Sequence, residues 1–152
     1  MKKIILSILI FIYFIALSTI TQANVGKVVI TGFKGTSPQE KQIQKLKSYI
    51  DQELIGGIIL FKRNIEHKQQ LIELISYLKS STDIFVVIDH EGGIVNRLTH
   101  PSFDLKTPSP ESFCKLPKDE QFKVANKITT TLNEIGINTN LGGVVDIAPY
   151  IH

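Results

Sequence analysis

The chain has 152 residues and a mass of 17.0 kDa, which is enough for one domain. Its 43% hydrophobic and 20% charged residues are typical of a globular protein and exclude a disordered one. The 17 basic and 14 acidic residues give a net charge of +3, and without Lys2 and Lys3 the counts are 15 and 14. Nucleic acid is therefore not expected as a partner. The single cysteine, Cys114, excludes an intramolecular disulfide.

The first 23 residues have the layout of a secretory signal. A basic start is followed by an apolar run over residues 4–17 and by a small-x-small cleavage site at residues 21–23. We expect residues 1–23 to be a signal peptide, and the protein to be exported to a bacterial periplasm or exterior with no stable membrane association after cleavage. The alternative is an uncleaved anchor, because the uncharged residues 4–23 are long enough to span a bilayer.

The next segment predicts a strand, a helix and a second strand. Residues 25–31 are rich in Val and Ile, and Ser37 with Glu40 forms a capping box that predicts a helix start. An unbroken apolar run over residues 58–61 is typical of a strand buried in a parallel sheet. The predicted buried face of the helix consists of Ile43, Leu46, Ile50 and Leu54.

The same alternation continues to the end of the chain. A second helix is predicted over residues 67–79 and an apolar strand over residues 84–88. A polar loop follows, then a third helix that ends at Gly136, then an apolar strand over residues 140–147. The apolar stripe of the third helix consists of Phe122, Ala125, Ile128, Leu132 and Ile135.

Strands that alternate with helices predict an α/β fold with a parallel sheet, either open and doubly wound or part of a β/α barrel. In both architectures, side chains that follow the strands gather at one edge of the sheet, where ligands bind. This rule selects residues 32–36, 62–64 and 89–97, together with Asp146.

Residues 89–97 are the densest of these candidate sites. Asp89, His90 and Glu91 follow an apolar strand, Gly92 and Gly93 would let the backbone approach a ligand, and Arg97 lies eight residues after Asp89. A carboxylate and a guanidinium in one pocket suit a polyhydroxylated ligand. The alternative is an ion pair between Asp89 and Arg97 inside a surface loop.

The other candidates have weaker patterns. A metal site from His90, Glu91 and His100 lacks the i, i+4 helical spacing, and residues 32–36 lack the spacing of a nucleotide loop, so we expect neither metal nor cofactor. Residues 62–64 could bind an anion or form a solvated strand end, and the pattern favours the strand end. Asp146 is a strand-end ligand or a helix cap, and Cys114 has no predicted role.

Three segments together resemble glycoside hydrolase family 3, in its branch of β-N-acetylhexosaminidases that act on peptidoglycan fragments. They are Gly-Gly-Ile-Ile-Leu-Phe-Lys-Arg-Asn at 56–64, Ile-Asp-His-Glu-Gly-Gly-Ile-Val-Asn-Arg-Leu at 88–98, and Gly-Ile-Asn-Thr-Asn at 136–140 with Val-Val-Asp at 144–146. The resemblance extends from about Val28 to Ile147. Ile94 departs from the Arg, and Gly142-Gly143 from the Ala-Pro, that are common in this branch.

The resemblance implies a β/α barrel that removes terminal β-linked N-acetylglucosamine with retention, through a covalent glycosyl-enzyme intermediate. Asp89 and Arg97 match substrate-binding residues of the sugar subsite, and Asp146 matches a supporting strand-end aspartate. The acid/base histidine and the nucleophilic aspartate of the family lie beyond residue 152. No residue of this chain is therefore assigned a catalytic role, His90, His100 and His152 included.

The predicted elements make up about half of a barrel. A β/α barrel needs about 250 residues and eight strands, whereas residues 24–152 predict four strands. We expect the first half of a TIM-like barrel, inactive by itself. Two other interpretations stay open: a secreted saccharide-binding module with a closed sheet of its own, and a half-barrel completed by a separately encoded C-terminal chain.

Overall fold

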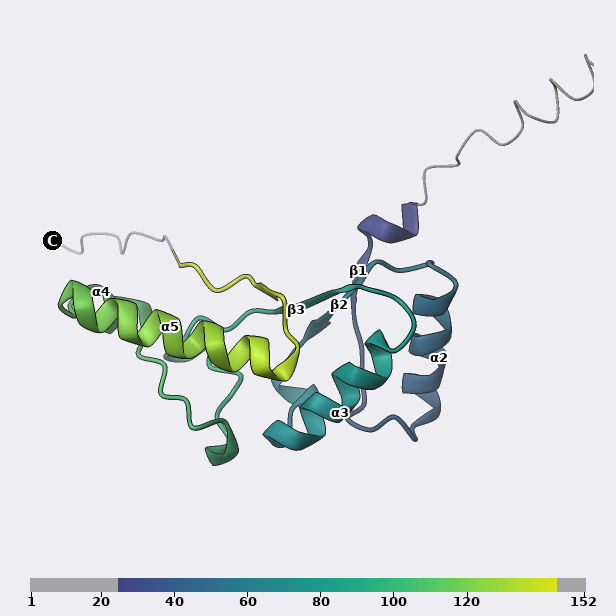
Figure 1. Cartoon of the computed structure of the whole chain (residues 1–152), viewed down its shortest axis with the longest axis horizontal. Coiled ribbons are helices and arrows are strands. Elements are labelled where there is room, and N and C mark those ends of the chain that lie inside the picture. The colour runs from purple at the N-terminus through teal and green to yellow at the C-terminus, as the bar shows by residue number, and fades with distance from the viewer. Residues whose placement is uncertain (1–24, 145–152) are drawn as a thin grey trace, which may run out of the picture.

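The computed structural model describes residues 25–144, which form a four-stranded parallel sheet (Figure 1). Each strand pairs with the strand that precedes it, in the order β1-β2-β3-β4. This order adds strands in one direction, as a β/α barrel does, and lacks the reversal of a doubly wound sheet. The strands are β1 (Ile30–Gly32), β2 (Gly57–Leu60), β3 (Phe85–Ile88) and β4 (Thr139–Asn140).

Three longer helices connect the strands, and their apolar faces form the core with one face of the sheet. Ile58 and Leu60 of β2 alternate with residues that face the other way, as do Val86 and Ile88 of β3, and all four join one buried cluster with the helices. The longer helices are α2 (Lys41–Asp51), α3 (Lys68–Lys79) and α5 (Lys118–Ile135). The short helices are η1 (Val25–Val28), η2 (Lys62–Asn64), η3 (Pro101–Phe103) and α4 (Pro110–Cys114).

The opposite face of the sheet carries an apolar row. Ile30 of β1, Gly57 of β2 and Phe85 of β3 are aligned by the strand register. Ile30 is 47% exposed and Phe85 is 54% exposed, so the described residues leave this row partly open to solvent. It lies on the face that a closed β/α barrel encloses.

The first predicted strand and helix both begin later than their patterns indicate. Residues 25–28 form η1, and the strand is confined to β1, because a turn closes on the Gly26 carbonyl, which accepts from the Val29 N–H at 3.0 Å. Glu40 accepts from the backbone N–H groups of Thr36 and Ser37, at 2.7 and 2.9 Å, but residues 37–40 form a turn ahead of α2. The capping carboxylate is thus present without the early helix start.

Three residues predicted on buried helix faces are exposed. Leu54 lies beyond the end of α2 and is 54% exposed, and Phe122 and Ala125 lie in the first half of α5, outside the buried cluster. Leu132 and Ile135, in the last turns of α5, are buried as predicted, and Gly136 caps the helix in the left-handed conformation at φ 91°.

Two further predictions, the signal segment and the last strand, concern residues that lie wholly or partly outside the described range. The signal segment, residues 1–23, lies outside the described residues, and within residues 25–144 no helix is long and apolar enough to cross a membrane. The last strand was predicted over residues 140–147. In the described range the strand is shorter: β4 begins one residue earlier and ends at Asn140, residues 141–144 belong to no strand, and residues 145–147 lie outside the described range.

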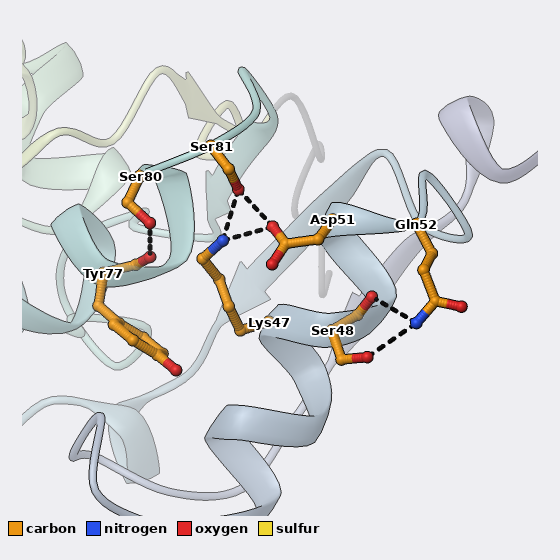
Figure 2. Close-up of polar contacts among 7 residues, drawn as sticks. All are labelled: Lys47, Ser48, Asp51, Gln52, Tyr77, Ser80 and Ser81. Atoms are coloured by element: carbon orange, nitrogen blue, oxygen red, sulfur yellow. Dashed lines mark hydrogen bonds and ion pairs between the residues drawn. The ribbon is translucent and has the colours of Figure 1, made fainter.

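A nearly buried lysine joins α2 to the turn between α3 and β3 (Figure 2). Lys47 has a side chain only 10% exposed, and its ammonium donates to Asp51 and to Ser81. The Ser81 hydroxyl donates to the same Asp51 oxygen. These two hydrogen bonds, with that of Lys47 first, hold the pKa of the Asp51 carboxyl below its ordinary value.

Removing Asp51 should destabilise the protein more than removing the charge of Lys47. Asp51→Ala leaves the Lys47 ammonium without its counter-charge in a site closed to water, whereas Lys47→Met keeps the apolar stem and leaves a carboxylate that water can reach. Thermal melts of both variants at pH 7 measure the difference. A larger loss of stability in Lys47→Met would contradict this account.

Candidate functional site

The candidate site lies at the carboxyl edge of the parallel sheet. Asp89 and His90 directly follow β3, and Asn140 ends β4, so the register of the strands brings them to the same edge. Ligands of parallel α/β proteins bind at this edge because the loops that follow the strands meet there.

Arg97 folds back onto Asp89 and forms a bidentate ion pair with it. Its Nε donates to Oδ1 at 2.7 Å and its Nη2 to Oδ2 at 2.5 Å. Hydrogen bonds from the guanidinium hold the pKa of the Asp89 carboxyl below its ordinary value, and those bonds raise the pKa of Arg97. The two side chains remain about one quarter exposed, so the predicted ion pair exists and is still accessible.

The loop between these two residues is a tight hairpin. The Glu91 N–H donates to the Val95 carbonyl at 3.0 Å, and the Val95 N–H donates to the Gly92 carbonyl at 3.1 Å. Gly92 and Gly93 have φ of 86° and 55°, and a Cβ on Gly92 would lie 2.1 Å from the Pro108 carbonyl oxygen. The sequence prediction gave these glycines a role in approaching a ligand, whereas their close contacts are with residues 107–109 of the chain itself.

Gly92→Ala should therefore be strongly destabilising. The alanine would need a left-handed φ and would press its Cβ into a backbone carbonyl, at a cost of about 2 kcal/mol or more. Gly143→Ala is the matched control, because a Cβ there meets nothing within 4 Å. Denaturant unfolding of both variants makes the comparison, and equal stabilities would contradict the packing argument.

His90 is buried beneath this hairpin, only 2% exposed. Its Nδ1 accepts from the Arg97 backbone N–H at 3.3 Å, and its Nε2 lies 2.8 Å from the Thr107 hydroxyl oxygen. Burial lowers the pKa of the imidazole, with a further lowering by the Arg97 charge that Asp89 partly opposes. The residue is therefore a neutral histidine inside the loop structure.

Two asparagines, which the sequence analysis did not single out, tie β4 to β3. Asn140 Oδ1 accepts from the His90 backbone N–H at 3.0 Å, and its Nδ2 donates to the His90 carbonyl at 3.1 Å. Asn138 bridges two residues instead: its Oδ1 accepts from the Val86 N–H at 2.8 Å, and its Nδ2 donates to the Ile84 carbonyl at 2.9 Å. Their spacing of two residues was the available signal, since alternate residues of a strand share a face.

Residues 32–36 and 62–64 are hydrogen-bonded to each other. Asn64 is fully buried and donates to the carbonyls of Phe33 and Gly35, at 3.2 and 3.1 Å. Arg63 Nε also donates to the Phe33 carbonyl, at 2.9 Å, and its guanidinium stacks over the Phe61 ring. The prediction of a solvated strand end is wrong for Asn64, which closes the loop from inside.

No three His, Cys, Asp or Glu side chains within residues 25–144 are arranged to hold a metal ion. His100 instead caps η3, since its Nδ1 accepts from the Ser102 N–H at 3.1 Å. Asp146 and His152 lie outside the described residues. Cys114 is exposed and lines a cavity of about 400 Å³, which His90, Phe113, Ile128 and Asn140 also line.

The model of the glycosyl hydrolase family 3 N-terminal domain matches residues 18–150. The chain belongs to glycosyl hydrolase family 3. It is 34% identical over 113 residues to β-hexosaminidase A of Pseudoalteromonas piscicida, an alignment that covers 68% of this chain and 19% of that protein. The chain thus spans about a fifth of the length of this relative.

Solved structures of the family share the fold. A family 3 β-N-acetylglucosaminidase from a Paenibacillus species superposes with a TM-score of 0.70 at 27% identity, over 85% of this chain and 25% of that one. Native NagZ of Neisseria gonorrhoeae gives 0.65 at 25% identity, over 80% and 36%. The N-terminal domain of these enzymes is a TIM-like barrel, so the α/β prediction with parallel strands of such a barrel is confirmed.

The ion pair between Asp89 and Arg97 should stabilise the protein in a pH-dependent way. Since folding lowers the pKa of Asp89, its contribution is fully present above about pH 4, the ordinary aspartate value, and is lost as the pH falls through the lower folded value. Asp89→Asn should lower the free energy of unfolding by about 1–2 kcal/mol at pH 7, and by less at pH 3.

Thermal melts from pH 7 to pH 3 measure this difference. Asp104→Asn is the control, because Asp104 pairs with Lys127 through a side chain that is 92% exposed. A constant difference between wild type and Asp89→Asn across the range would count against a folded-state ion pair.

Proposed function

We propose that this chain belongs to an exported, retaining β-N-acetylhexosaminidase and forms one wall of its sugar subsite. The observation that carries the proposal is the accessible bidentate pair of Asp89 and Arg97 at the carboxyl edge of the sheet. Family membership and the β-hexosaminidase relatives support it. The substrates would be N-acetylglucosaminides of the peptidoglycan type.

The pair suits a neutral sugar. Arg97 donates two of its five guanidinium N–H groups to Asp89, so the guanidinium retains donors for ligand hydroxyls, and each carboxylate oxygen retains a lone pair. Neighbouring sugar hydroxyls both donate and accept, so one ion pair can hold two of them. The low pKa of Asp89 keeps its carboxylate an acceptor at neutral and mildly acidic pH.

The contribution of this wall to the reaction would be orientation. Hydrogen bonds to the hydroxyls of the non-reducing sugar would point its anomeric carbon at the nucleophile. This orientation would lower the entropic part of the activation free energy. We propose that the acid/base histidine and the nucleophilic aspartate come from the part of the family domain beyond residue 152, on the same chain or on a second one. Asp146 would support the site from the end of the fourth strand.

The proposal includes export. The basic start, the apolar residues 4–17 and the small residues before Asn24 support cleavage of residues 1–23 and delivery to a bacterial periplasm or exterior. N-terminal sequencing of the secreted protein tests this part, with Asn24 as the expected first residue.

Binding of N-acetylglucosamine tests the sugar subsite directly. We expect saturable chemical-shift changes in a two-dimensional NMR titration, and an affinity reduced about tenfold or more in Asp89→Ala and Arg97→Ala, because each removes charged hydrogen-bond partners of the sugar. Lys127→Ala, which removes an exposed cation from another ion pair, should bind like wild type. Unchanged affinity in all three variants would contradict the proposal.

Hydrolysis separates the subsite from the catalytic residues. The 152-residue chain should bind the sugar and should not hydrolyse p-nitrophenyl N-acetyl-β-D-glucosaminide. Turnover by this chain would show that the assignment of the catalytic residues beyond residue 152 is wrong. Absence of sugar binding would instead reject the subsite.

A further inference from the structure

His90 connects three segments of the candidate site. Its Nδ1 accepts from the Arg97 backbone N–H, its Nε2 meets the Thr107 hydroxyl, and the Asn140 side chain holds both its backbone N–H and its carbonyl. Asp89 is its direct neighbour in the chain. Both partners of the ion pair are therefore fixed through the same buried residue.

The hydrogen bonds define which form of the imidazole is present. Nδ1 must offer a lone pair, because its partner is the backbone N–H of Arg97, which can only donate. The proton of the neutral ring then lies on Nε2, which donates to the Thr107 oxygen. A doubly protonated ring would set two N–H groups against each other at Nδ1.

We propose that His90 is a positioning residue for saccharide binding, whose neutral imidazole fixes the backbone of Arg97 so that its guanidinium meets Asp89 in bidentate geometry. The inference rests on the proposed function of this pair. Bidentate pairing requires both N–H vectors of the guanidinium to align with the carboxylate, and the backbone of Arg97 is the point from which that side chain extends. His90 itself does not contact the sugar.

The charges around the imidazole give the proposal a pH dependence. Arg97 disfavours the protonated ring and Asp89 favours it, while Thr107 and Asn140, from the two other segments, present only neutral groups. Among the described residues that line the neighbouring cavity, Glu91 on the hairpin and Cys114 are the other titratable side chains. Protonation of Nδ1 would release the Arg97 backbone and weaken sugar binding.

Two variants of equal shape isolate the acceptor. His90→Asn places Oδ1 near the position of Nδ1 and keeps an acceptor for the Arg97 N–H, whereas His90→Leu has the same branching and no acceptor. We expect His90→Asn to bind N-acetylglucosamine within about threefold of wild type, and His90→Leu to lose about tenfold or more. Thr107→Val, which removes only the Nε2 partner, should bind like wild type.

The pH dependence of sugar affinity separates the positioning role from a purely structural one, because a structural role of His90 would not make the affinity change with the protonation of its ring. Wild-type affinity should fall as the pH drops through the pKa of His90, which burial holds below the ordinary histidine value, while the affinity of His90→Asn should not change with pH. Equal affinities of the Asn and Leu variants, with equal melting temperatures, would overturn the proposal. The proposal would also be overturned if His90→Asn showed the same pH dependence of sugar affinity as wild type.

Hydrogen exchange of the Arg97 side-chain Nε–H separates this proposal from the proposed function. It reports the pairing with Asp89 without any sugar, and its protection should persist in His90→Asn and fall in His90→Leu. If exchange follows the acceptor but wild type binds no sugar, the proposed function fails and the positioning of Arg97 stands. If exchange is the same in both variants, the positioning role is rejected.

Discussion

The candidate site depends on the in-register parallel pairing of consecutive strands. Because β3 pairs with β4 up to Ile88 and Asn140, the residues that follow β3 come within reach of the Asn140 side chain. That amide then continues the ladder two residues past the end of β3, because it bonds to both the backbone N–H and the carbonyl of His90. The start of the 89–97 loop is therefore an extension of the sheet, held to β4 by the side chain of Asn140.

Most polar groups of this loop are hydrogen-bonded within it or to neighbouring segments, except the buried Asn96 Oδ1, which has no hydrogen-bond partner among the described residues. Asp89 pairs with Arg97, His90 with Thr107 and the Arg97 backbone, and the hairpin closes from Gly92 to Val95. The left-handed glycines let the hairpin press against Pro108. A site with few unsatisfied groups is preorganised, since a ligand need not pay for ordering the loop.

Periodicity predicted the parts of this molecule that depend on local burial. The apolar runs of β2 and β3 and the helices α3 and α5 follow from side-chain spacing alone, and Asp89 with Arg97 follows from their position after a strand. What failed depends on contacts distant in sequence. Leu54 and Phe122 fit helical stripes, yet nothing in the described fold covers them, and the amide bonds of Asn138 and Asn140 require a neighbouring strand that the sequence does not locate.

The internal pairing also bounds how strongly this wall can bind. Asp89 and Arg97 already neutralise each other, so a sugar gains hydrogen bonds only with the donors and lone pairs that face outward, and gains little from charge. Each such bond to a hydroxyl exchanges one with water, so its net contribution is small. Tight and selective binding of a sugar therefore requires contacts beyond those of Asp89 and Arg97. The role proposed for this wall is to orient the sugar, and a bidentate pair that is already formed without a ligand suits that role.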